Sequence, residues 1–490
     1  MLSLIAPDLK KDAVELLAIP VCEDKEIHTH RTIAALVRRA RRLPEFKGKK
    51  DETVILYDPS GAAAERVLFQ GLGKADAADL ETFRVAAGKA VSRAMGMDLT
   101  SLWLACPGAA KAGLDKADLA EALLEGACLS NHVFDAFKKE GKKSPIKDIG
   151  VVVTADRVKS LARLPDRVAT VCGATLLARD WVSMPSNHKT PYLLGKEMAR
   201  EAESAGLRVT VMEEKELAEK NFGAVMAVAQ GSQNPPRLVI MEYAPEGAKK
   251  TAVLVGKGVT FDTGGINLKS SEGLKGMKSD MAGAAATAAA LIAMGRLRPD
   301  IRVVGIMPLV ENMPSGDAIR PGDVIRTYSG KSVEIGNTDA EGRLILADAL
   351  AYGVAQYKPD LVIDLATLTG ACLMALGEKI AAVFSGDDDL AAAIEAAGRK
   401  THERCWRMPL PDDYKELLKS DLADIGNMPK TRYGGAITAA LFLSEFVGDA
   451  RWAHIDIAGP GYARKKGPYC PVGGSGFGVR LICEALSSLL

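Results

Sequence analysis

The most constraining feature of this sequence is a series of apolar runs that alternate with helical patterns after residue 165. Most runs, such as AVLVG (252–256) and LVIDLA (361–366), are apolar at consecutive positions. Strands buried on both faces have this composition, and they form parallel sheets covered by helices. We expect strands at 207–212, 237–243, 252–256, 302–310, 361–366, 380–385 and 452–459, and helices at 214–219, 282–297, 342–357 and 436–447.

A shorter alternation of the same kind covers residues 16–154, where LLAIPV, TVILY, SLWLA and IGVVVT are the strand-like runs. A helical stretch at 168–181 then leads into SMPSNHKTP (183–191), whose prolines break regular structure. A chain of 490 residues is long for a single domain. We therefore predict an α/β protein of two domains. These are a smaller N-terminal α/β domain (1–165) and a larger C-terminal α/β/α domain with a mostly parallel central sheet (166–490).

The nearly equal numbers of acidic and basic residues exclude a strong electrostatic field around the whole protein. The 63 Lys and Arg residues nearly cancel the 62 Asp and Glu residues, so DNA binding is possible but not indicated. Eight cysteines are scattered without close pairs, and the sequence shows neither a secretory signal nor a membrane-spanning run. We expect a cytoplasmic protein without membrane contact.

Two Gly-rich segments concentrate charged side chains that lack the polar surroundings of a solvated loop. They are GKGVTFDTGGINLK (256–269) and NTDAEGRL (337–344), with Asp280 between them. Buried carboxylates cost several kcal/mol each unless cations neutralise them, and here four carboxylates face two lysines. The imbalance predicts a metal site.

The predicted elements bring these side chains together. Lys257 and Asp262 leave the end of one strand, and Asp280 precedes a helix whose first turns are almost all Ala and Gly. Asp339 and Glu341 precede or open the next helix, and we expect both in its non-helical lead-in, because residues two apart on a helix face different ways. Oxygen-rich ligands suit Mg, Mn, Zn or Co, and four carboxylates favour two ions over one. A lysine ligand requires that these ions lower the pKa of its amine.

These segments, together with MKSDMAGAA, DLATLTGA, RYGGAITAALFLSEFV and WAHIDIAGP, resemble the leucyl (cytosol) aminopeptidase family from about Trp181 to the C-terminus. The resemblance implies an enzyme that removes N-terminal residues, preferably apolar and leucine-like, from peptides by a hydroxide that two metals activate. It also implies two divalent ions, Mn or Zn, and a homohexamer. Small departures from the family pattern occur at Thr263, Asn267 and Ser475.

Residue roles follow from the same resemblance. Lys269 would polarise the scissile carbonyl, and Arg343 would hold a bicarbonate ion that acts as general base. Asp262 and Glu341 would bridge the two metals. The implied metal ligands are Lys257, Asp262, Asp280, Asp339 and Glu341, and the implied wall of the substrate pocket is Met277 with Thr367, Leu368, Thr369 and Gly370.

Several alternatives remain at this point. Asp339, Glu341 and Arg343 also suit the cap and first turn of an ordinary helix. A two-metal phosphoesterase and a nucleic-acid-binding regulator that keeps the peptidase fold are the rival functions. His454, within the predicted strand 452–459, is expected to be a core histidine with Asp456 as its partner.

Overall fold

The computed structural model describes residues 1–108, 112–140 and 144–489. The chain divides into two compact units, Met1–Gly173 with Lys465–Pro471, and Ala174–Arg464 with Val472–Leu490. The division between them falls within helix α6 (Leu164–Ser183). The sequence predicted a boundary near residue 165, before a helix expected at 168–181.

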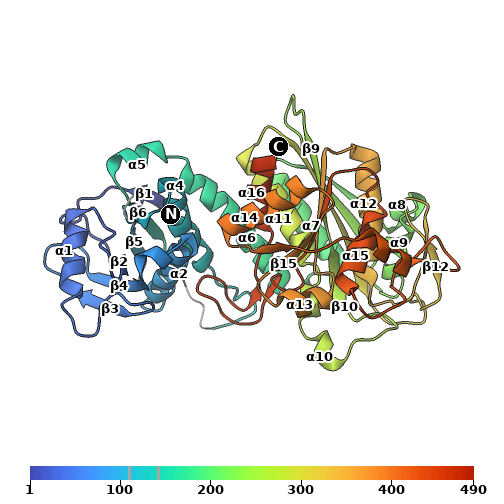
Figure 1. Cartoon of the computed structure of the whole chain (residues 1–490), viewed down its shortest axis with the longest axis horizontal. Helices are drawn as coiled ribbons and strands as arrows, with labels where there is room; N and C mark the ends of the chain where they lie inside the picture. The colour runs from blue at the N-terminus through green and yellow to red at the C-terminus, as the bar shows by residue number, and fades with distance from the viewer. Residues whose placement is uncertain (109–111, 141–143, 490) are drawn as a thin grey trace. The chain divides into compact units, whose positions relative to one another are not determined.

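The first unit contains a six-stranded sheet of order β1-β6-β5-β2-β4-β3, parallel except for the antiparallel pair β3 and β4. Helices α2 and α4 pack against each other and against this sheet, and α1 packs its apolar face on β2 and β4 (Figure 1). The strands are β1 (Leu2–Ile5), β2 (Leu16–Cys22), β3 (Thr53–Tyr57), β4 (Arg66–Gly73), β5 (Ser101–Ala105) and β6 (Asp148–Val152). The helices are α1 (Arg31–Ala40), α2 (Leu80–Met95), α4 (Lys116–Ser130) and α5 (Ala155–Ser160), with a 3₁₀ turn η1 (Ala75–Ala77).

The second unit is built on a nine-stranded sheet of order β16-β15-β18-β14-β9-β11-β8-β7, with β10 paired to β11. The central strands β18, β14, β9 and β11 are parallel, as predicted, while β8, β7 and β15 join antiparallel to their inner neighbours. The strands are β7 (Arg208–Glu213), β8 (Arg237–Tyr243), β9 (Thr251–Gly256), β10 (Gly258–Asp262), β11 (Arg302–Asn312), β14 (Leu361–Ala366), β15 (Ala381–Phe384), β16 (Cys405–Arg407) and β18 (Trp452–Asp456).

Helices cover both faces of this sheet, with α11 and α12 on opposite sides of β9 (Figure 1). Val253 and Val255 belong to the core cluster that also contains the apolar residues of α12, whereas Gly256 lies against Ala284 of α11. The helices are α7 (Pro191–Ser204), α8 (Glu214–Glu219), α9 (Gly223–Ala229), α10 (Ser271–Leu274), α11 (Ala282–Leu297), α12 (Glu341–Tyr357), α13 (Gly370–Leu376), α14 (Asp388–Thr401), α15 (Gly435–Ser444) and α16 (Val479–Leu489).

Shorter elements complete the unit. Strands β12 (Val324–Arg326), β13 (Ser332–Glu334) and β17 (Ile425–Gly426) form a small sheet, and β19 (Tyr462–Ala463) pairs with β20 (Gly473–Gly474). The 3₁₀ turns are η2 (Ser186–His188), η3 (Met277–Ser279) and η4 (Asp412–Leu418). No helix within the described residues has the length and apolar character needed to cross a membrane.

Candidate metal centre

Three buried carboxylates meet at the carboxyl ends of the parallel strands. Asp262 ends β10, Asp280 follows η3, and Glu341 is the first residue of α12. One ligand oxygen from each lies within 4.8 Å of the others. Parallel strands of an α/β sheet place their ligand sites at this edge. The fold thus brings together residues that are separated by up to 79 positions in the sequence.

Lys257 follows the end of β9 and pairs with two of these carboxylates. Its Nζ lies 2.9 Å from Asp280 Oδ2 and 2.9 Å from Glu341 Oε1, and it donates a hydrogen bond to the carbonyl of Thr367 at 3.0 Å. Burial by itself would lower the pKa of Lys257, but the surrounding carboxylates outweigh burial and raise it. Divalent cations in the same space would act in the opposite direction, because they disfavour the charged amine.

Lys269 holds a second part of the site. Its Nζ lies 2.8 Å from Asp262 Oδ2 and also pairs with Asp339, which stands in the lead-in to α12. The turn before Lys269 needs Gly264 and Gly265, whose φ angles are +86° and +64°. A Cβ on Gly264 would lie 2.9 Å from Asp339 Oδ1, so this glycine lets the turn approach the carboxylate.

The carboxylates respond differently to burial and to their neighbours. Burial, followed by the charge of Glu341, raises the pKa of Asp262 to about 6, although Lys269 opposes the change. Burial also raises the pKa of Asp280 well above its ordinary value. The pKa of Glu341 is lowered, because Lys257 and Lys269 together outweigh the effect of its burial. Clustered carboxylates with separated pKa values are typical of functional sites.

The donor set fits divalent metal ions. Glu341 Oε2 is buried without a hydrogen bond from any described residue, so it remains available as a ligand. Arg343 is also buried, and its Nη1 donates to the carbonyl of Asn427 at 2.8 Å while its Nε has no hydrogen-bond partner within the described part of the chain. Burial lowers the pKa of Arg343 to about 10. Buried oxygen ligands that outnumber the nearby lysines are the donors that Mn, Mg or Zn accept.

The predicted wall of the substrate pocket borders the cluster through one residue. Thr367 Oγ1 donates to Asp280 Oδ1 at 2.8 Å. Leu368 N donates to Asp456 Oδ1 at 3.1 Å, and Gly370 begins α13 just after the N-cap residue Thr369. Met277, which is half-buried, opens the turn η3 that leads to Asp280.

Two expectations were wrong. Glu341 lies in the first turn of α12 rather than in its lead-in, and the first-turn geometry still lets it converge with the other ligands. His454 pairs with Asp364 at 2.6 Å instead of with Asp456. Strands β14 and β18 place Asp364 directly opposite His454, so the partner comes from the neighbouring strand.

The sequence interpretation missed a network of amides and hydroxyls behind the ligands. Asn312 Nδ2 donates to Asp262 Oδ1 at 2.9 Å and to the carbonyl of Thr338 at 3.0 Å, and Asn267 Oδ1 accepts from Thr338 N at 2.8 Å. Such contacts orient metal ligands. Asn312 could have been found from its place as a polar residue just after the apolar run 302–310. Thr263, which departs from the family pattern, belongs to the same network, because its hydroxyl donates to the carbonyl of Asn312 at 2.7 Å.

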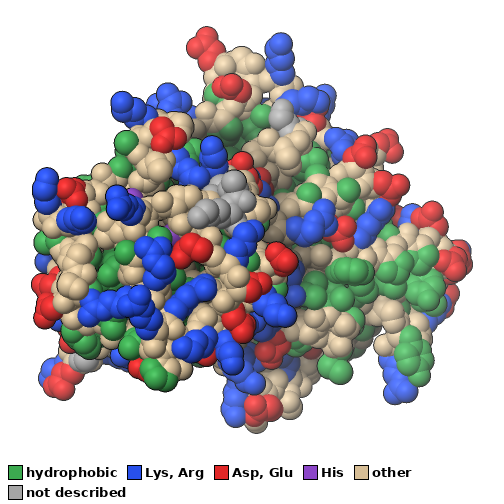
Figure 2. Space-filling model, turned by 60° about the vertical axis from the view of Figure 1, so that its left-hand side comes forward, with side chains coloured by type: hydrophobic (Ala, Val, Ile, Leu, Met, Phe, Trp, Pro, Cys, Tyr) green, Lys and Arg blue, Asp and Glu red, His purple; other side chains and the backbone are tan. Residues whose placement is uncertain are grey.

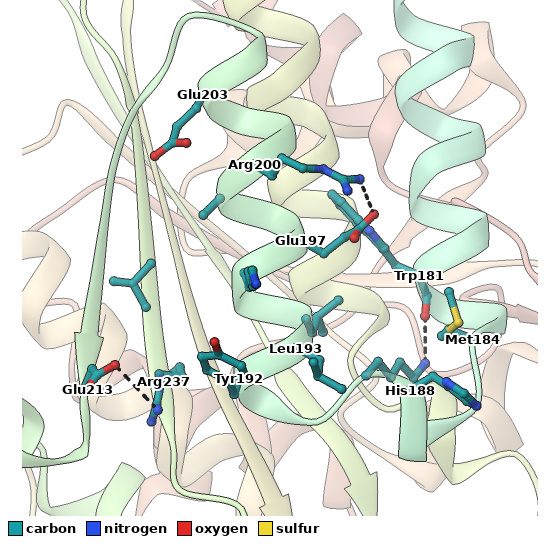
Figure 3. Close-up of a pocket in the computed structure, with 15 residues that line it drawn as sticks. Trp181, Met184, His188, Tyr192, Leu193, Glu197, Arg200, Glu203, Glu213 and Arg237 are labelled. Atoms are coloured by element: carbon teal, nitrogen blue, oxygen red, sulfur yellow. Dashed lines mark hydrogen bonds and ion pairs between the residues drawn. The ribbon is translucent and has the colours of Figure 1, made fainter.

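A separate cavity of about 610 Å³ lies along α7 and β7, where Trp181, Tyr192, Leu193 and Arg237 line it (Figure 3). Of the described residues that line it, none is a predicted site residue. It is therefore distinct from the carboxylate cluster.

An α/β sheet whose strand ends carry a buried cluster of carboxylates and lysines defines this protein as a metal-dependent hydrolase. The model of the cytosol aminopeptidase family, catalytic domain, matches residues 176–483, and that of the N-terminal domain of the same family matches residues 21–141. The chain belongs to the cytosol aminopeptidase family, and it is a metal-dependent aminopeptidase.

Relatives and solved structures agree with this assignment. A probable cytosol aminopeptidase of Chlorobium phaeobacteroides is 43% identical over 98% of this chain and 97% of that protein. The bottromycin maturation enzyme BotP in complex with Mn has a TM-score of 0.86 and 38% identity, covering 97% of this chain and 99% of that one. A mutant of tomato leucine aminopeptidase has a TM-score of 0.87 and 31% identity, with 99% and 95% covered.

Proposed function

We propose that this aminopeptidase releases apolar, leucine-like N-terminal residues and that two divalent ions, Mn or Zn, work in its site. The observation that carries the proposal is the buried cluster of Asp262, Asp280 and Glu341, whose ligand oxygens lie within 4.8 Å of one another. Asp339 adds a fourth carboxylate through its pairing with Lys269. Only Lys257 and Lys269 form ion pairs with these four groups in the described structure, and Lys257 gives up its charge when it serves as a metal ligand. Four carboxylates then face one lysine cation, and a single dication would leave part of the negative charge uncompensated, so we propose two ions.

The ligand roles divide between two positions. Lys257, Asp262, Asp280 and Glu341 would hold the ion at the tighter position, and Asp262, Asp339 and Glu341 would hold the ion at the looser one. The ions, when bound, supply the positive charge that acidifies a water molecule and polarises the scissile carbonyl. Lys257 serves there as a neutral amine. Asn312 orients Asp262 through its 2.9 Å hydrogen bond.

Two cations of the chain complete the chemistry. Lys269 Nζ, which sits between Asp262 and Asp339, donates to the carbonyl oxygen of the substrate and stabilises its developing negative charge. Arg343 would hold a bicarbonate ion, which would supply a general base for the attacking water. Its buried Nε, without a hydrogen bond from the described residues, supports this anion-binding role.

The preference for an apolar first residue rests on the segment that borders the ligands. Thr367 touches Asp280, and the chain continues through Leu368 into α13. Met277 lies three residues before Asp280 in sequence and is half-buried. The side chain of a bound N-terminal residue would thus contact Met277 and the 367–370 segment.

Assembly and location complete the proposal. We assign the N-terminal domain, residues 1–165, to the assembly of a homohexamer, because it contains none of the predicted site residues. The cysteines are free thiols, and relatives are named cytosol aminopeptidases, which supports the cytoplasm as the compartment. Acidic and basic side chains both occur on the face in Figure 2, and the 63 Lys and Arg residues nearly cancel the 62 Asp and Glu residues, so DNA binding is not part of the proposal. Light scattering of the purified protein tests the hexamer.

The decisive experiment measures hydrolysis of leucine, glutamate and lysine p-nitroanilides by protein freed of metal and then supplied with Mn or Zn. Bound metal per chain is counted by mass spectrometry. We expect two ions per chain, hydrolysis only with metal, the highest kcat/KM for leucine, and no reaction with N-acetyl-leucine p-nitroanilide. Asp339→Ala should abolish turnover, whereas Asp421→Ala, which changes a carboxylate that is 95% exposed, should leave it unchanged.

Each part of the proposal has its own contrary result. One ion per chain at full activity would overturn the two-metal site. Faster cleavage of the glutamate or lysine substrate would overturn the apolar preference. Wild-type activity in Asp339→Ala would remove that residue from the ligand set.

A further inference from the structure

Asn427 is a fully buried residue that follows β17, about 90 positions after the metal-binding loop in sequence. Its side-chain oxygen accepts from the backbone N–H of Gly336 at 2.7 Å and of Asn337 at 3.3 Å. Its side-chain nitrogen donates to the carbonyls of Asn337 at 2.8 Å and of Ala340 at 3.5 Å. The amide therefore uses both its donor and its acceptor capacity on one short stretch of backbone.

The backbone of Asn427 contacts the two ends of the same segment. Its N–H donates to the carbonyl of Glu334 at 2.9 Å, at the end of β13, and its carbonyl accepts from Arg343 Nη1 at 2.8 Å. Asn427 thus contacts the chain before, within and after the lead-in that carries Asp339 and leads into Glu341.

This lead-in has little regular structure to fix its path. Residues 335–340 lie between β13 and α12, and their backbone groups need partners where they are buried. Without the Asn427 amide, the N–H groups of Gly336 and Asn337 and the carbonyl of Asn337 would each lose a hydrogen bond. Partners behind the ligands matter because ligand side chains have to be held within roughly 0.5 Å of their productive positions.

We propose that Asn427 is a positioning residue for the metal centre. Its amide fixes the lead-in to α12, so that Asp339 and Glu341 present their carboxylates to the ions. The inference rests on the proposed ligand roles of those two residues. It does not require Asn427 to touch metal or substrate.

The test is a titration of the metal-free full-length protein with Mn²⁺, in which electron paramagnetic resonance reports the free Mn²⁺. The same preparations are used to measure kcat, KM and thermal unfolding. Asn427→Ala should weaken Mn²⁺ binding about 10- to 100-fold, the usual range for partners behind metal ligands. At subsaturating Mn²⁺ it should lower kcat with little change in KM. Asn427→Asp has the same shape and keeps the acceptor for Gly336 and Asn337, but it turns an oxygen instead of a donor toward the carbonyls of Asn337 and Ala340. It should therefore weaken Mn²⁺ binding as well, and it decides the question if Asn427→Ala does not fold.

The matched control is Asn131→Ala. The Asn131 side-chain amide forms two hydrogen bonds, of 2.8 and 2.9 Å, with the backbone of Ile146 in the first unit. The control therefore loses a similar pair of side-chain to backbone hydrogen bonds away from the metal centre. It should lower thermal stability and keep wild-type Mn²⁺ affinity. Wild-type Mn²⁺ affinity in a folded Asn427 variant would overturn the inference, and so would an equal loss of affinity in Asn131→Ala.

Glu341→Gln separates this inference from the proposed function. Lost Mn²⁺ binding in Glu341→Gln with normal binding in the Asn427 variants would overturn only the positioning role. Wild-type binding in Glu341→Gln would overturn the ligand set on which the inference depends.

Discussion

Gly342 provides a sharp test of the position of the Lys257 amine. A Cβ at residue 342 would lie 2.6 Å from Lys257 Nζ and 2.5 Å from its Cε. Since such atoms normally approach to about 3.5 Å, Gly342→Ala would displace the amine by roughly 1 Å. That displacement breaks its 2.9 Å contacts with Asp280 and Glu341. The clash falls on a side chain rather than on the backbone, although this side chain is buried and held by Asp280, Glu341 and Thr367.

The expected cost falls on both activity and stability. A misplacement of about 1 Å at a reacting centre lowers the rate about 100-fold, which corresponds to roughly 2.7 kcal/mol in the barrier. The free energy of unfolding should fall too, because a buried lysine loses its contacts with two buried carboxylates. The preference of a helix for alanine over glycine, about 1 kcal/mol, offsets only part of that loss. The assay is leucine p-nitroanilide hydrolysis at saturating Mn²⁺, with chemical unfolding of the same preparation.

Gly173→Ala is the matched control. Gly173 lies within α6, and a Cβ there would meet no described atom within 4 Å. This variant should keep wild-type kcat and gain slightly in stability. Wild-type kcat and metal content in Gly342→Ala would refute the reasoning, since Lys257 could then move without consequence.

Two further predictions concern single side chains. Lys269→Met keeps the apolar stem but removes the donor, so kcat at saturating Mn²⁺ should fall about 100- to 1,000-fold with KM nearly unchanged; a kcat within a few-fold of wild type would contradict the role. Burial raises the pKa of Asp348 to about 7, although backbone N–H groups of Tyr328, Val225 and Ala224 oppose the change. Between pH about 4 and 7 the native state therefore holds a proton at Asp348 that the unfolded state has lost, and stability falls as pH rises, by at most roughly 4 kcal/mol. Urea unfolding at pH about 4 and about 7 measures this fall in the free energy of unfolding, which should be smaller in Asp348→Asn than in the wild type. An equal fall in the two proteins would count against the raised pKa of Asp348.

Local composition was enough to predict the main strands of the large sheet and several of its helices. The strand expected at 361–366 and the helix expected at 282–297 coincide with β14 and α11, because their apolar character marks them as buried wherever they pack. Helices α7, α14 and α16 were not among those expected. Other errors concern ends, since α12 begins at Glu341 rather than Gly342 and β18 ends at Asp456 rather than 459. Capping and hydrogen bonding decide such ends, and apolar periodicity does not report them.

Local sequence patterns could not predict the contacts between segments that are distant in the sequence. The partner of His454 was expected two residues along its own strand, yet it is Asp364 on β14, since the register of two strands places them opposite each other. Asn312 and Asn427 escaped notice for the same reason. The segments that they hold lie about 50 and 90 positions away.

The sequence by itself determined which functional side chains this protein has. It specified an unusual set of carboxylates and lysines in Gly-rich segments, the strands and helices that carry them, and the family motifs. Only the tertiary structure decided that Asp262, Asp280 and Glu341 converge within 4.8 Å, and that Asn427 holds the loop before α12. The physical reason is that side-chain types and periodicity are local properties, whereas convergence depends on strand register and on the close approach of helices to the sheet.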